Sequence, residues 1–263
     1  MAGETTASGV GGTGGEGGSS AGTSASGGAS GAPDAATWDA GTRESGSIDA
    51  NGDARRVVLL LYGNETNPRD YAPRDDMKQV LESMAVSHGV VVDMQEDVQT
   101  TSATAAGKSL LVISGNCKAF PPYDGQLAMK FKEVTIPMIV SKDPVGKDMG
   151  MVTNASATDP PDDTQFRIVK PDDAMAAGLS GVITVYPSGS RLITGNPGPE
   201  ATIIATTAAD NRAVIYAFAA GAAMVGGYKA PAKRLGFFWH RPTGGTDDAK
   251  KLFRAAVDWA LKP

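Results

Sequence analysis

Apolar residues in this chain gather in short continuous runs instead of alternating with polar residues. The runs span residues 57–62, 90–94, 110–113, 137–140 and 235–239. Strands buried on both faces, as in a parallel sheet, show this pattern, whereas half-solvated strands alternate. We therefore predict that these runs form the strands of a mainly parallel sheet.

Segments with helical spacing lie between the runs. The first is predicted to begin at Asp75 or Asp76, since a carboxylate suits a helix N-terminus, and to stop at Gly89. One or two helical turns are expected at 101–106, and a further helix follows the run at 110–113. Crossovers of this length favour β-α-β units with helices on both faces of the sheet.

The amphipathic pattern of the C-terminal residues, which follow Thr246, predicts one more helix. Thr246 is suited to cap its N-terminus, and Leu252, Phe253 and Val257 share one apolar face. We expect that face to be buried against the sheet.

The pattern changes between the fourth run and the last. Residues 159–191 contain Pro-rich turns and short β-like pieces. Residues 201–206 and 213–218 flank a polar turn and predict an antiparallel hairpin. The expected fold is therefore α/β, a mainly parallel flavodoxin-like sheet with helices on both faces plus an antiparallel hairpin and β insertion.

Residues 1–53 have a different composition from the rest. They are rich in Gly, Ser, Thr and Ala, and Trp38 is their single aromatic residue. Such a segment buries too little apolar surface to offset its chain entropy, so we predict a flexible linker ahead of one folded domain, residues 54–263.

The linker resembles the stalks that follow the lipidated cysteine of bacterial surface lipoproteins. That resemblance implies an extracellular or cell-surface location, with a lipid anchor upstream of these residues. The alternative is a disordered tail with no such role.

Charge and residue counts exclude several classes of function. A formal net charge of -5 argues against a nucleic-acid partner, which requires a basic face. No apolar run is long enough to span a membrane. The single Cys117 excludes an internal disulfide and a cysteine zinc cluster, and no spacing suggests another metal site. The sequence contains no Gly-rich phosphate loop of the kind that binds nucleotides, so we expect no cofactor.

The order of these segments resembles the glutamine amidotransferase-like superfamily, and especially its ThuA-like branch. The resemblance rests on residues 57–64, 110–116 and 176–181, and on 236–240 running into 253–259. It implies a flavodoxin-like fold. Uncharacterised domains of bacterial secreted proteins, which follow similar linkers, are also similar.

The family's catalytic residues carry over only in part. Active amidotransferases have a nucleophilic Cys after the strand that matches 137–140, where this chain has Ser141, Lys142 and Asp143. His240 matches the family's His, but Pro242 stands where an acidic residue follows it. The resemblance therefore implies a triad that lacks both its nucleophile and its orienting acid.

The candidate site residues all follow predicted strands, and ligands of open α/β sheets bind at the carboxyl ends of strands. His240 is either a site residue or a His held by local backbone groups, and Cys117 is either a reactive thiol or a small buried hydrophobe. Ser141 and Lys142 form either a Ser–Lys pair or a solvated loop. Candidate ligand-binding residues are Asn64, Gly115, Asn116 and Lys142.

Three functions remain open at this stage. The domain is a non-catalytic or degenerate binding module, a ThuA-like hydrolase or sugar-processing enzyme that uses His240 as acid or base, or a structural domain without a ligand. For the first two we expect a sugar or a small carboxylate as the ligand. The sequence gives no prediction of the oligomeric state.

Overall fold

The computed structural model describes residues 55–64, 71–157, 164–240 and 244–263, all within one unit of the chain, Arg43–Pro263. The expected linker, residues 1–53, lies outside the described residues. In this part of the chain, no helix is both long and apolar enough to cross a membrane.

The described strands are β1 (Arg56–Tyr62), β2 (Val90–Glu96), β3 (Leu110–Ile113), β4 (Met138–Val140), β5 (Val152–Ala157), β6 (Gln165–Ile168), β7 (Gly181–Thr184), β8 (Ile193–Pro197), β9 (Thr202–Thr206), β10 (Ala213–Phe218) and β11 (Arg234–Phe237). The described α-helices are α1 (Ala72–Ser83), α2 (Ala85–His88), α3 (Gln126–Phe131), α4 (Asp143–Asp148) and α5 (Asp247–Leu261). Short 3₁₀ helices are η2 (Asp97–Gln99), η3 (Ser102–Ala105), η4 (Ala174–Ala176) and η5 (Val225–Gly227).

The strands form one mixed sheet whose first half is parallel. Strands β2, β1, β3, β4 and β11 are parallel neighbours in that order, the arrangement of flavodoxin-like sheets. Strands β10, β9, β6 and β7 continue the sheet in antiparallel fashion. The predicted fold class is confirmed, including the hairpin of β9 and β10.

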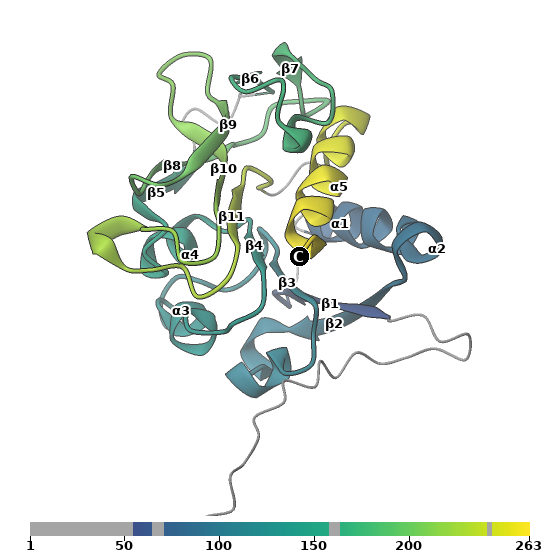
Figure 1. Cartoon of the computed structure of the whole chain (residues 1–263), viewed down its shortest axis with the longest axis vertical. Coiled ribbons are helices and arrows are strands. Elements are labelled where there is room, and N and C mark those ends of the chain that lie inside the picture. Colours follow the sequence, from purple (N-terminus) through teal and green to yellow (C-terminus); the bar gives the residue numbers. More distant parts are fainter. Residues whose placement is uncertain (1–54, 65–70, 158–163, 241–243) are drawn as a thin grey trace, which may run out of the picture. The chain divides into compact units, whose positions relative to one another are not determined.

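Helices cover both faces of the parallel half, as Figure 1 shows. Successive residues of β1 point to opposite faces, so Val58 and Leu60 join one core cluster with α1 and α5. Leu59 and Leu61 join the other cluster, with α3 and α4. Burial on both faces is the reason why the run is continuously apolar.

The closing helix α5 packs as its pattern predicts. Thr246 Oγ1 accepts a hydrogen bond from the Ala249 N–H at 3.3 Å, which confirms the expected cap. Phe253 is fully buried, and its ring centroid lies 5.4 Å from that of Phe237 and 5.5 Å from that of Trp239. The helix therefore closes the core at the carboxyl end of β11.

The structure corrects three predicted boundaries. Helix α1 begins at Ala72, before Asp75, because Pro73 is compatible with a first helical turn. The helical turns expected at 101–106 are the 3₁₀ helix η3, which spans only Ser102–Ala105. The run at 235–239 leaves the sheet after Phe237, and Trp239 makes only an isolated antiparallel bridge.

Strands β5 and β8 were not predicted. They pair with each other in antiparallel fashion, and β8 contacts the main sheet at the pair Gly195 and Ala213. Neither shows a continuous apolar run, since β5 carries the exposed residues Thr153 and Asn154 and β8 includes a proline. Half-solvated strands without strict alternation give a weak sequence signal.

A buried cation fixes the start of β11. The Arg234 guanidinium donates to the carbonyl oxygens of Ile136, Val134 and Lys132 at 2.9, 2.6 and 3.3 Å. Burial lowers the pKa of Arg234 to about 10, so the group remains charged at neutral pH. The contacts bind the segment that leads into β4 to the amino end of β11.

We expect Phe253→Ala to destabilise the domain by about 3–5 kcal/mol, because it removes a ring that fills the core between α5 and β11. Urea unfolding followed by circular dichroism measures this. The matched control is Met129→Ala, whose side chain is 79% exposed and whose loss should cost less than about 0.5 kcal/mol. A loss below about 1 kcal/mol for Phe253→Ala would contradict the observed packing.

Candidate functional site

The carboxyl ends of β1, β3, β4 and β11 meet at one edge of the sheet. A methyl group placed on Gly115 would lie 2.7 Å from the carbonyl oxygen of Trp239 and 3.0 Å from that of Ser141. It would also lie 3.3 Å from the Cα atom of His240. The structure thus brings together Gly115, Ser141 and His240, which follow three different predicted strands.

A second close contact joins the ends of β1 and β3. A methyl group on Gly63 would collide with the carbonyl oxygen of Asn116. The Asn116 side chain is fully buried, donates to the Gly63 carbonyl oxygen at 3.1 Å, and accepts from the Ser114 hydroxyl. The Asn116 side-chain amide is therefore used in a bond to the backbone. Asn64, the residue after Gly63, is exposed.

Cys117 lies beneath these ends. It is buried, and its Sγ donates to the Leu61 carbonyl oxygen at 3.3 Å. Burial, and secondarily the nearby Asp97 carboxylate, raises the pKa of the Cys117 thiol far above its usual range. A thiol that keeps its proton is a poor nucleophile, so this environment is that of a structural cysteine.

The prediction that Ser141 and Lys142 form a solvated loop is wrong. Ser141 is fully buried, Lys142 is 3% exposed, and α4 begins directly after them at Asp143. The Lys142 ammonium donates to the Gly115 carbonyl oxygen at 3.1 Å and lies 5.2 Å from the Phe120 ring centroid. Ser141 Oγ has no hydrogen-bond partner among the described residues, so Lys142 does not activate it.

His240 is half-buried at the end of β11, and a neighbouring tyrosine holds its backbone. Its N–H donates to the Tyr186 hydroxyl oxygen at 2.9 Å, and that hydroxyl donates to the Phe238 carbonyl oxygen at 3.3 Å. Burial raises the pKa of Tyr186, so the phenol stays protonated. Tyr186 lies in the segment 159–191, for which the sequence predicted turns and short β-like pieces but gave no signal of a contact with a strand end 54 residues later in the chain.

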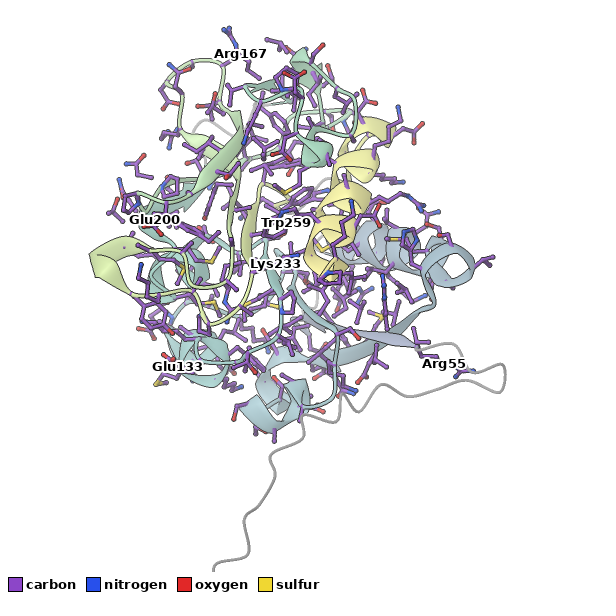
Figure 2. The ribbon with its side chains drawn as sticks, in the orientation of Figure 1. Arg55, Glu133, Arg167, Glu200, Lys233 and Trp259 are labelled. Atoms are coloured by element: carbon purple, nitrogen blue, oxygen red, sulfur yellow. The ribbon has the colours of Figure 1, made fainter. Side chains whose placement is uncertain are left out.

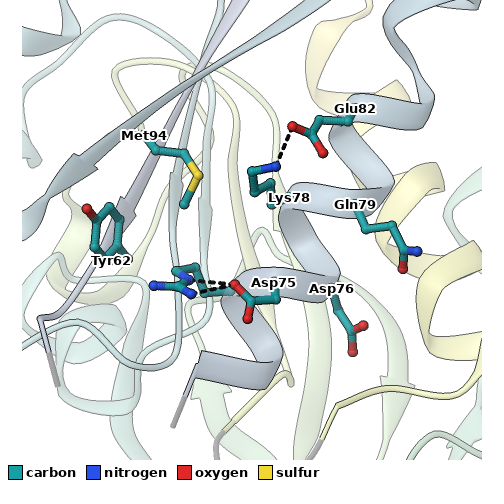
Figure 3. Close-up of a pocket in the computed structure, with 8 residues that line it drawn as sticks. Tyr62, Asp75, Asp76, Lys78, Gln79, Glu82 and Met94 are labelled. Atoms are coloured by element: carbon teal, nitrogen blue, oxygen red, sulfur yellow. Dashed lines mark hydrogen bonds and ion pairs between the residues drawn. The ribbon is translucent and has the colours of Figure 1, made fainter. Parts of the chain in front are cut away.

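A depression of about 640 Å³ lies nearby, between α1 and the ends of β1 and β2. Figure 3 shows its walls, with Tyr62 and Met94 on one side and the α1 side chains on the other. Each charge that lines it has a partner: Arg74 pairs with Asp75, Lys78 with Glu82, and Asp76 with Lys250. These pairs leave the depression with little charge to offer an ionic ligand.

The described residues contain no group of three or more His, Cys, Asp or Glu side chains arranged to hold a metal ion.

Neither a protein-family model nor a curated protein matches this chain. Among solved structures, it is similar to a ThuA-like protein from Bacteroides uniformis, with 9% identity and a TM-score of 0.52 over 78% of this chain and 91% of that one. The mmIFT52 N-terminal domain is similar at 12% identity and a TM-score of 0.51, covering 79% of this chain and 98% of that domain. At these identities the likeness shows the fold alone, and the expected flavodoxin-like fold is confirmed.

We expect the Cys117 thiol to react with a disulfide reagent at least about 100-fold more slowly in the folded chain than in urea, because it is buried and protonated. Since Cys117 is the single cysteine, colour release by the reagent reports on it alone. The control is the exposed thiol introduced by Asn64→Cys in a Cys117→Ser background, which should react at the unfolded rate. Equal native rates for the two thiols would contradict the structural assignment.

Proposed function

We propose that this domain is a non-catalytic binding module of ThuA-like fold. It holds a sugar or a small carboxylate at the carboxyl edge of its parallel sheet, beside His240. We further propose that residues 1–53 act as a flexible stalk that displays the domain at a cell surface. The stalk proposal is supported by composition alone, because those residues lie outside the described part of the chain.

The burial of every candidate nucleophile at the strand ends carries this proposal. A covalent catalyst needs an activated group that can reach its substrate. The Cys117 side chain and the Ser141 hydroxyl are buried, and the Lys142 ammonium is bound to the Gly115 carbonyl oxygen. Cys117 and Lys142 donate to backbone carbonyl oxygens, and the buried Ser141 hydroxyl has no hydrogen-bond partner among the described residues that could activate it, which supports binding over catalysis.

The accessible groups at the edge suit a polar ligand. Asn64 is exposed and His240 is half-buried, and the ring of Phe120 is 53% exposed above the Lys142 ammonium. Hydrogen-bonding groups beside an apolar ring are typical of sites for small polar molecules. Open α/β sheets bind their ligands at this edge.

One observation favours a hydrolase as the second candidate. His240 lies at a strand end with its backbone held by Tyr186, and a positioned His is the commonest general acid or base. In that function His240 would activate a water molecule directly, since the chain offers no covalent nucleophile at the matching turn.

Binding and turnover can be measured in one sample. The chain has only two histidines, so the imidazole Cε1–H proton gives only two NMR signals, and that of His88, paired with Asp258 at 3.0 Å, serves as an internal control. We expect some members of a panel of sugars and small carboxylates to shift the His240 signal saturably and to leave the His88 signal in place. The same spectra should show no product from any ligand, nor any hydrolysis of glutamine.

Turnover that disappears in His240→Ala and persists in His88→Ala would establish the hydrolase instead. Glutamine hydrolysis that disappears in Cys117→Ser would establish an amidotransferase-type reaction. If no sugar or carboxylate in the panel shifts the His240 signal, the binding proposal is contradicted.

A further inference from the structure

Strand β2 forms one border of the sheet. It pairs with β1 in a parallel register over seven residues, and no other described strand pairs with it. The Arg56 N–H donates to the Gly89 carbonyl oxygen at 3.0 Å, and this bond sets the alternation along the ladder. The backbone groups of Val90, Val92 and Met94 therefore face away from β1. A border strand with such groups is a template on which a further strand can pair.

Strand β2 lacks the features that usually protect a border strand. Its register with β1 is continuous, without a bulge, and its sequence contains no proline. Its central charge is compensated, because the Asp93 carboxylate lies 2.7 Å from the Lys108 ammonium. Val92 and Met94 are only partly buried where they pack against the core cluster that contains α1 residues. The border is thus regular, electrically balanced at its centre and incompletely covered on one face.

The two ends of this border carry opposite charges. Arg56 lies beside Val90 in the register, at the amino end, and Glu96 is the last residue of β2, at the carboxyl end. Val90 and Val92 pack on the α1 side of the sheet, and the alternation of the ladder places Arg56 and Glu96 on that same side. Figure 2 labels Arg55, the residue before Arg56, at the margin of the molecule in that view.

We propose that two copies of this chain form a dimer by antiparallel pairing of their β2 strands about a two-fold axis at Asp93. The register that uses the outward-facing groups of both strands puts Val92 of one copy beside Met94 of the other, and Val90 beside Glu96. The two sheets then continue into each other across the axis. This interface is isologous, the commonest kind in homo-oligomers, and it does not depend on the ligand-binding function proposed above.

Charge complementarity supports a second copy as the partner of this border. In the proposed register, Arg56 of one copy and Glu96 of the other lie in one row across the joined sheet, two strand spacings or about 10 Å apart at their backbones. Their long side chains can meet over Val90, and the two-fold axis forms this pair twice. At the axis each Asp93 already has its own Lys108 partner, so neither copy presents an uncompensated charge there.

Sedimentation velocity of the full chain measures the dimer directly. We expect the wild-type chain to change from monomer to dimer mass as its concentration rises towards about 100 µM. Arg56→Glu and Glu96→Arg should each raise the dimer dissociation constant at least about tenfold, because each change places like charges in both rows.

Mixing the two variants identifies the contact. An equimolar mixture of Arg56→Glu and Glu96→Arg should restore the dimer, since each row then holds one acid and one base again. Within one copy the two positions are about 20 Å apart along the strands, so a rescue requires pairing between copies. The rescue also shows that both variants are folded, because an unfolded chain has no β2 border to pair.

The matched control is Arg167→Glu on β6. It makes the same charge reversal at an exposed position that lies far from Arg55 in Figure 2, and it should change the dimer dissociation constant less than about twofold.

Four results would overturn the proposal. A wild-type chain that stays monomeric over the whole concentration range forms no such dimer. A dimer that neither Arg56→Glu nor Glu96→Arg weakens uses another surface. A mixture that stays monomeric contradicts the register about Asp93. Equal weakening by Arg167→Glu would assign the effect to net charge instead of the β2 border.

Discussion

The close approach of backbones at the strand ends is the constraint on which this edge of the domain depends. Gly63 and Gly115 lie so near the carbonyl oxygens of Asn116 and Trp239 that neither position has room for a Cβ atom. Neighbouring strands are about 4.8 Å apart, and here the chains converge further as they leave the sheet. Because glycine has no side chain, these two positions allow the ends of β1, β3, β4 and β11 to pack this closely.

That convergence decides which side chains remain for a ligand. Polar groups directly under the strand ends, in Asn116, Cys117 and Lys142, point inward and donate to buried backbone carbonyl oxygens. His240, which follows β11, is only half-buried. The edge lies at the carboxyl ends of parallel strands, where open α/β sheets bind ligands, and the Cys117 thiol there is buried and protonated.

The fold was predictable because burial on both faces leaves a direct record in the sequence. The run at 110–113 coincides with β3, and the amphipathic pattern around Phe253 coincides with α5. For the candidate site, the sequence predicted that its residues follow strands, but it did not predict which of their side chains are buried. A solvated loop was one of the two interpretations of Ser141 and Lys142 because adjacent side chains rarely point at the same spot, and only the packed structure supplies the carbonyl partner of Lys142. Tyr186 reaches His240 through a hydrogen bond between residues 54 positions apart, which no local pattern encodes.

Amide hydrogen exchange in Gly115→Ala tests the central role of backbone convergence most directly. The added methyl group should separate the strand ends and accelerate exchange about tenfold or more at Ser141 and His240, whose N–H groups bond to Ile113 O and Tyr186 Oη. Exchange at Val169, bonded to Ile204 O in the antiparallel part of the sheet, should stay unchanged. Gly146→Ala, where an added Cβ meets only ordinary contacts, is the control and should change neither region. Unaltered exchange at His240, or equal acceleration at Val169, would contradict the account.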